Sequence, residues 1–142
     1  MPPAQATGSS RVNAPRPDLS FALRLPRAPA ATGDARHVIR RRLGKLLSED
    51  ALDDVLLVVT ELVANALLHG RGDITMKLAF DGRRVLGLVG DEGLGFSAAV
   101  REPGTRRIGG YGLEIVERLS ASWGHEQGSS DVSFEIAARR TR

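Results

Sequence analysis

Residues 51–69 read ALDDVLLVVTELVANALLH, and their apolar positions recur with the period of an α-helix. At about 100° per residue, one broad sector of this helix is apolar. Its members are Leu52, Val55, Leu56, Val59, Leu62, Val63, Ala66 and Leu67. Asp54, Glu61 and Asn65 fall on the opposite side, and Ser48 offers a cap for the first turn. This helix is the clearest element of the chain.

Strands are predicted on both sides of this helix. Apolar and polar residues alternate over residues 19–25 and 74–80, as in half-buried strands. Asp81-Gly82 then supplies a turn into residues 85–89, a nearly unbroken apolar run. This run predicts a strand that is buried on both faces.

The other elements complete a single order of strand, helix, helix, strand, strand, helix, strand, strand. They are a helix over 31–47, a loop over 93–110, a short helix carrying Leu113, Val116 and Leu119, and strands near 123–127 and 132–138. Hairpins between the later strands favour an antiparallel arrangement. The expected fold class is α/β, an α+β two-layer sandwich whose mixed, largely antiparallel sheet is covered on one face by three helices.

The length of 142 residues suits one domain with a single core. Prolines among small polar residues predict a disordered tail over residues 1–18. The predicted domain covers 19–138, and 139–142 form a basic C-terminal tail.

Composition excludes several classes of protein. Cysteine is absent, which excludes disulfides, thiolate metal sites and cysteine nucleophiles. No apolar run approaches the roughly 20 residues that cross a bilayer, and the N-terminus lacks a secretory apolar region, so a cytoplasmic protein without membrane contact is expected. The net charge is +3, and the run Arg40-Arg41-Arg42 lies in a helical pattern that favours a solvated face over direct nucleic-acid binding.

Glu61 and Asn65 are four residues apart on the predicted helix, so their side chains share one face. A carboxylate beside an amide oxygen suits Mg²⁺, and the carboxylate can instead accept a proton from an attacking hydroxyl. The same pair also fits an exposed polar face without any ligand. Taken alone, these residues leave the three interpretations open.

Asp91 directly follows the apolar strand and precedes Gly93 and Gly95. A carboxylate at such a place needs a hydrogen-bond donor, and the exocyclic amine of adenine is suitable, although an ordinary turn also fits. Glycines beside it let the backbone approach a flat base. Further along, Gly109, Gly110 and Gly112 stand at the start of the third helix, where free amides favour phosphate. The arginines Arg106 and Arg107 in the preceding loop could reach phosphate oxygens, and charges on a solvated loop fit equally well.

These segments together resemble the N, G1 and G2 boxes of the histidine-kinase-like ATPases. The matching residues are Glu61-x-x-x-Asn65 with His69-Gly70, Asp91-x-Gly93-x-Gly95, and Gly110-x-Gly112-Leu113. The similarity covers roughly residues 19–138 and is nearest to small bacterial anti-sigma factor serine kinases. It implies a Bergerat-type sandwich that binds ATP and Mg²⁺.

The resemblance also implies roles for single residues. Asn65 would hold Mg²⁺, Glu61 would be the catalytic base, and Asp91 would bind the adenine amine. The walls of the nucleotide pocket would be formed by Gly93, Gly95, Gly110, Tyr111, Gly112 and Leu113. Ser130, in a Gly-Ser-Ser-Asp turn that departs from the family's Gly-Thr-Thr-like turn, is a second candidate for an adenine contact.

The implied function is a protein-serine/threonine kinase that phosphorylates an anti-sigma antagonist in partner switching. Its expected partners are a sigma factor, an antagonist protein or both, and a homodimer is possible. The alternative is a module that binds ATP and a partner without significant turnover. A dinucleotide-binding fold is disfavoured because Pro103-Gly104 follows Gly93-Leu94-Gly95 too soon for a crossover helix. No phosphoacceptor region is present, which argues against a sensor histidine kinase.

Overall fold

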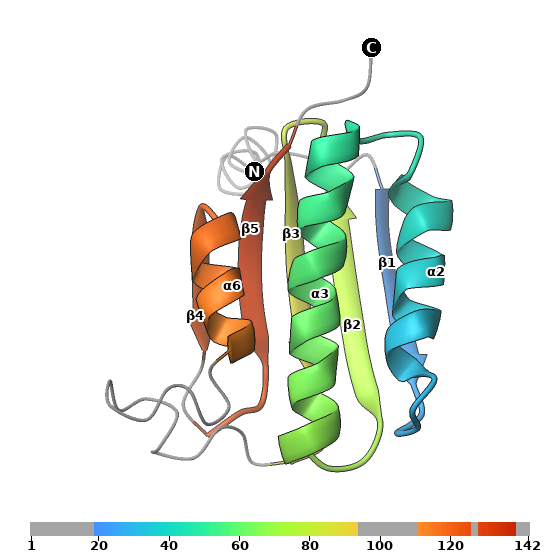
Figure 1. Cartoon of the computed structure of the whole chain (residues 1–142), viewed down its shortest axis with the longest axis vertical. Helices are drawn as coiled ribbons and strands as arrows, with labels where there is room; N and C mark the ends of the chain where they lie inside the picture. The colour runs from blue at the N-terminus through green and yellow to red at the C-terminus, as the bar shows by residue number, and fades with distance from the viewer. Residues whose placement is uncertain (1–18, 94–110, 126–127, 139–142) are drawn as a thin grey trace, which may run out of the picture.

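The computed structural model describes residues 19–93, 111–125 and 128–138. Five strands form one sheet, and three helices cover one of its faces, with α3 between α2 and α6 (Figure 1). In chain order the elements are β1 (Leu19–Leu25), α2 (Ala31–Leu43), α3 (Glu49–His69), β2 (Ile74–Phe80), β3 (Arg84–Gly90), α6 (Tyr111–Leu119), β4 (Ser122–His125) and β5 (Val132–Ala137). The predicted two-layer sandwich is confirmed. The predicted tails and most of the 93–110 loop lie outside the described residues.

The strand order is β1-β2-β3-β5-β4, and every described neighbour pair is antiparallel. Two helices connect β1 to β2, so the chain reverses direction three times and β2 returns antiparallel beside β1. One helix connects β3 to β4, which gives these two strands the same direction, but β5 lies between them. The described part of the sheet therefore contains no parallel neighbours, although the predicted sheet was mixed.

The core lies between the sheet and the helices. Alternation in β2 directs Ile74, Met76, Leu78 and Phe80 inward, and each of them is buried. In α3 the facing side chains are also buried, among them Val55, Val59, Leu62 and Val63. Each such aliphatic side chain contributes about 1.5–3 kcal/mol through removal from water. The long helix α3 is thereby fixed against the middle of the sheet.

Both ends of α3 have satisfied backbone groups. The Ser48 hydroxyl accepts from the Ala51 amide at 3.2 Å, which confirms the predicted cap. The helix begins at Glu49, two residues before the predicted start, and its acidic first turn suits the helix dipole. At the other end the Gly70 amide donates to the Ala66 carbonyl at 2.8 Å. After Gly70 the chain leaves the helix.

Two predictions about single elements are wrong. Helix α2 ends at Leu43 rather than at residue 47, because Gly44 follows and the amides of Leu46 and Leu47 both turn back to the Leu43 carbonyl. Strand β3 is not buried on both faces: Leu86 on its outer face is 42% exposed. An apolar run predicts double burial only where both faces are covered, and here the helices form one layer.

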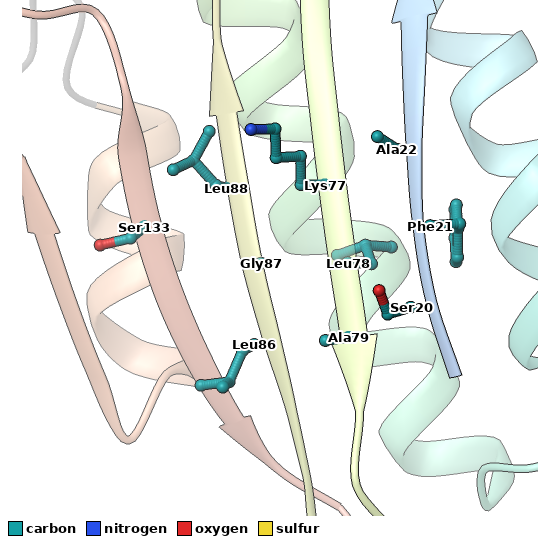
Figure 2. Close-up of a pocket in the computed structure, with 10 residues that line it drawn as sticks. All are labelled: Ser20, Phe21, Ala22, Lys77, Leu78, Ala79, Leu86, Gly87, Leu88 and Ser133. Carbon is teal, nitrogen blue, oxygen red and sulfur yellow. The ribbon is translucent and has the colours of Figure 1, made fainter. Parts of the chain in front are cut away.

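The outer face of the sheet carries a shallow hollow (Figure 2). Residues of β1, β2, β3 and β5 line it, including Lys77, Leu86 and Leu88. None of the predicted site residues lies among its lining residues. Within the described ranges, no helix is both long enough and apolar enough to cross a membrane.

Candidate functional site

The predicted polar residues that the structure describes belong to segments that meet at one end of the sandwich. Helix α3 finishes there, β3 finishes there, and β5 begins there (Figure 1). Asp91 follows β3, Ser130 precedes β5, and Asn65 lies about one turn before the end of α3. Glu61 lies one further turn back. The fold thus brings together residues that are up to 69 positions apart in the sequence, from Glu61 to Ser130.

The carboxylate of Asp91 is held by main-chain donors. Its Oδ1 accepts from the Gly93 amide at 2.6 Å and from the Arg71 amide at 3.2 Å. Its Oδ2 lies against Gly70, where a Cβ atom would overlap it. No donor among the described residues hydrogen-bonds to Oδ2. One oxygen of Asp91 is therefore oriented by the backbone, and the other has capacity to accept from a ligand.

A short loop after α3, residues 70–73, is joined to the segment after β3. The Glu92 amide donates to the Arg71 carbonyl at 2.8 Å, and the Asp73 amide donates to Glu92 Oε2 at 3.0 Å. Gly72 has a φ of 66°, and a Cβ there would overlap the Glu92 side chain. These contacts make the 70–73 loop and residues 91–93 one connected unit.

Ser130 fixes the backbone of Asp91 from the opposite side. Its hydroxyl donates to the Asp91 carbonyl at 2.8 Å and accepts from the Asp91 amide at 2.7 Å. A hydroxyl oxygen has two acceptor positions, so one remains after these two bonds. The predicted adenine contact of Ser130 therefore stays a prediction, and its contact with Asp91 is one that the sequence did not indicate.

Asn65 does not lie on an exposed polar face, which was one of the three interpretations left open for it. It is only 8% exposed, and its buried Nδ2 has no hydrogen-bond partner in the described part of the chain. An unsatisfied buried amide costs about 1–3 kcal/mol. Asn65 thus lies outside the apolar sector of α3 and is nevertheless buried, and α3 packs against α6 as well as against the sheet.

This amide fits a ligand that carries its own metal ion. A half turn of the Asn65 amide would present its oxygen where the nitrogen now lies. Mg²⁺ is usually bound through few protein oxygens together with waters and phosphates. The described residues contain no cluster of three or more His, Cys, Asp or Glu that could hold a metal ion. Asn65 and the half-buried Glu61 would complete such a site only with a phosphate ligand.

The acidic residues at the start of α3 are separate from this site. Burial, followed by the charges of Asp50 and Asp53, raises the pKa of Asp54 above its usual value. Asp54 lies about two turns before Glu61, towards the end of α3 that is remote from Asp91. Its charge therefore bears on the stability of the helix rather than on the Asp91 end.

Several predicted residues have a less complete description. Leu113 is buried in α6, where it packs into the core. Tyr111 and Gly112 form the first residues of that helix. Gly95, Gly110 and the arginines Arg106 and Arg107 lie outside the described residues. Their contribution to a phosphate wall remains a prediction.

Sequence reasoning missed the part played by the 70–73 loop and by Arg27. The loop had one visible signal, Gly72 between Arg71 and Asp73, which is typical of a backbone turn with positive φ. Arg27 had no local signal, because its hydrogen-bond acceptors lie 40 and 45 residues further along the chain.

The geometry defines an α/β sandwich with a held carboxylate, a buried amide and a glycine-rich turn at one end. A family model described as the histidine kinase-like ATPase domain matches residues 25–133. The chain belongs to this family. Among the curated proteins that were compared, none matches it.

Thirteen chains of solved structures match the fold. One is the crystal structure of the RsbU and RsbW domains of Rv1364c from Mycobacterium tuberculosis, with a TM-score of 0.63 and 21% sequence identity. The match covers 89% of this chain and 34% of that one, so this chain spans about a third of the longer protein. At this identity the similarity establishes the fold.

Proposed function

We propose that the chain binds ATP with Mg²⁺ at the Asp91 end and transfers the γ-phosphoryl group to a serine or threonine of an anti-sigma antagonist protein. The observation that carries the proposal is the buried amide of Asn65, which has no hydrogen-bond partner for its Nδ2 among the described residues and lies one helical turn from Glu61. Membership of an ATPase family supports the nucleotide. The resemblance to anti-sigma factor kinases, and a similar structure that contains an RsbW domain, support the protein substrate.

In this proposal each described residue has a separate role. Asp91 Oδ2 accepts from the adenine amine, while main-chain amides hold Oδ1. Ser130 maintains the position of Asp91 and has one acceptor position left for a hydrogen bond from adenine. Asn65 supplies an amide oxygen to the metal. Mg²⁺ held there would supply positive charge that neutralises the negative charge developing on the phosphate groups.

Glu61 is the proposed base. The substrate hydroxyl oxygen forms a bond to the γ-phosphorus while the bond from that phosphorus to the β,γ-bridging oxygen breaks. The hydroxyl proton passes to the Glu61 carboxylate, and ADP leaves with the bridging oxygen. Positioning and charge neutralisation supply most of the acceleration in such a transfer, so few side chains are needed.

The test separates binding from transfer. We expect calorimetry to detect binding of ATP in the presence of Mg²⁺, and γ-labelled ATP to label a candidate antagonist protein on serine or threonine. The variant Glu61→Gln should bind ATP about as well as the parent protein and lose transfer by roughly 10²-fold or more. Undiminished transfer in E61Q would contradict the role of Glu61. ATP binding without labelling of any antagonist would favour the partner-binding module instead of the kinase.

A further inference from the structure

Arg27, in the segment between β1 and α2, bridges the last turn of α3 and the 70–73 loop. Its Nη1 donates to the Leu67 carbonyl at 2.8 Å, and its Nε donates to the Gly72 carbonyl at 3.0 Å. Its Nη2 is buried without a hydrogen-bond partner in the described ranges. An arginine on an open surface would keep all its donors in water. The two carbonyl contacts hold Arg27 in place, although its Nη2 has lost contact with water without gaining a hydrogen bond from the described residues.

The first contact replaces a helical hydrogen bond that α3 lacks. In a continuing helix the Leu67 carbonyl would accept from the amide four residues later, which belongs to Arg71. The Arg71 amide instead donates to Asp91 Oδ1. Arg27 thus satisfies the carbonyl that is left without a donor when the Arg71 amide turns to the Asp91 carboxylate.

The second contact fixes the far side of the loop. The Gly72 carbonyl that accepts from Arg27 belongs to a residue with positive φ, packed against Glu92. Asp73, the next residue, hydrogen-bonds to Glu92 through its amide. The planar guanidinium therefore spans the loop, from the last turn of α3 to the residue that contacts the segment after Asp91.

We propose that Arg27 is a positioning residue for base recognition: it holds the 70–73 loop so that the Arg71 amide orients the Asp91 carboxylate towards the 6-amine of adenine. The inference rests on the proposed adenine contact of Asp91. A lysine at this position would have one compact ammonium group and would not bridge both carbonyls with the same geometry.

The experiment compares ATP with purine riboside triphosphate, which has hydrogen in place of the 6-amine. Dissociation constants for both are measured by calorimetry with Mg²⁺ present. The parent protein should prefer ATP by about tenfold or more, the effect of one hydrogen bond to a charged group. Arg27→Met should reduce this preference by about fivefold or more. The preference of Arg27→Lys should lie between those of the parent protein and R27M. If Arg27 has a purely structural role, its replacement should weaken the binding of both nucleotides equally and leave the ratio of their dissociation constants unchanged.

Arg24→Met is the matched control. Arg24 lies three residues away and also contacts the loop, but only through a 3.7 Å ion pair with Asp73 in which its side chain is 74% exposed. Its removal should leave the ATP preference intact. If R27M does not fold, the ratio of the two dissociation constants is measured on R27K instead.

Two results would overturn the inference, and they are distinguishable. A parent-like ratio in a folded R27M or R27K protein, with a clear ATP preference in the parent, would refute the role of Arg27 alone. A parent protein without any ATP preference would refute the adenine contact of Asp91, and with it the role of Arg27.

Discussion

The hydroxyl of Ser130 and the backbone of Asp91 exchange two hydrogen bonds, at 2.7 and 2.8 Å, across 39 residues of sequence. The β3–β5 ladder has Val89 and Val132 as its last pair at this end. Beyond that pair, the serine side chain takes over the bonding that a neighbouring strand would provide. The site thus begins where regular strand pairing stops, and Asp91 keeps a fixed backbone there.

Ser130→Ala should lower both stability and nucleotide affinity. It removes two hydrogen bonds and leaves the Asp91 amide and carbonyl without partners, which costs about 1–3 kcal/mol of unfolding free energy. Denaturant unfolding and calorimetric titration with ATP measure the two effects. Ser133→Ala, at an exposed position of β5, is the control and should change neither. A normal affinity in a destabilised S130A would separate Ser130 from the site.

Gly70→Ala should abolish nucleotide binding. The added Cβ would overlap Asp91 Oδ2 and lie 2.8 Å from the Ala66 carbonyl oxygen, so the carboxylate would have to move. Gly33→Ala is the control, because a Cβ at this position in α2 meets no atom within 4 Å. It should stabilise the protein by about 0.5–1 kcal/mol through helix propensity. Unchanged ATP affinity in G70A would show that the position of Asp91 does not matter for binding.

Asn65→Ala should separate stability from function. Removing the unsatisfied amide relieves a desolvation cost and offsets part of the packing loss, so the ligand-free unfolding free energy should change by less than about 1 kcal/mol. Leu62→Ala, also buried in α3, should cost about 2–5 kcal/mol. In N65A the dependence of ATP affinity on Mg²⁺ should disappear. Calorimetry with Mg²⁺ and with a chelator measures this, and a retained Mg²⁺ dependence would remove Asn65 from the metal site.

The hairpin turn between β2 and β3 should contribute a pH-dependent term to stability. Above all the hydrogen bond from the Arg83 backbone, and then contacts with Arg84, hold the pKa of Asp81 below its usual value of 3.8, against a smaller opposing effect of burial. The folded state therefore favours the charged form. This stabilisation is present above the usual pKa and is lost as pH falls through the lower folded-state pKa.

Asp81→Asn tests this contribution. The variant should be less stable than the parent at pH 7, by about 1 kcal/mol or less because water partly screens the charges at this half-buried turn, and the difference should shrink below pH 4. Urea unfolding across this range measures it. Arg83→Ala keeps the backbone amide and should leave the pH dependence as it is. A pH-independent difference in D81N would contradict the assignment.

Elements with a complete periodic pattern were predictable. Strands β1 and β2 have the bounds that alternation predicts, and α3 ends where its pattern ends. The end of α2 was not predictable from the same pattern, because Leu46 and Leu47 continue the apolar spacing while Gly44 allows the chain to turn. The exposure of Leu86 depends on the number of covering layers. Local patterns do not contain that number.

The sequence by itself determined the layers, the long helix α3 and the residue types that support ATP binding, because these follow from periodicity and from motifs within short segments. Only the tertiary structure decided how Asp91 is held. Its amide donors belong to Arg71 and Gly93, its backbone partner is Ser130, and Arg27 braces the loop. These contacts join groups 20 to 45 residues apart, or lie in a turn that they stabilise. Their formation depends on where whole helices and strands end in space, which no local pattern of residues specifies.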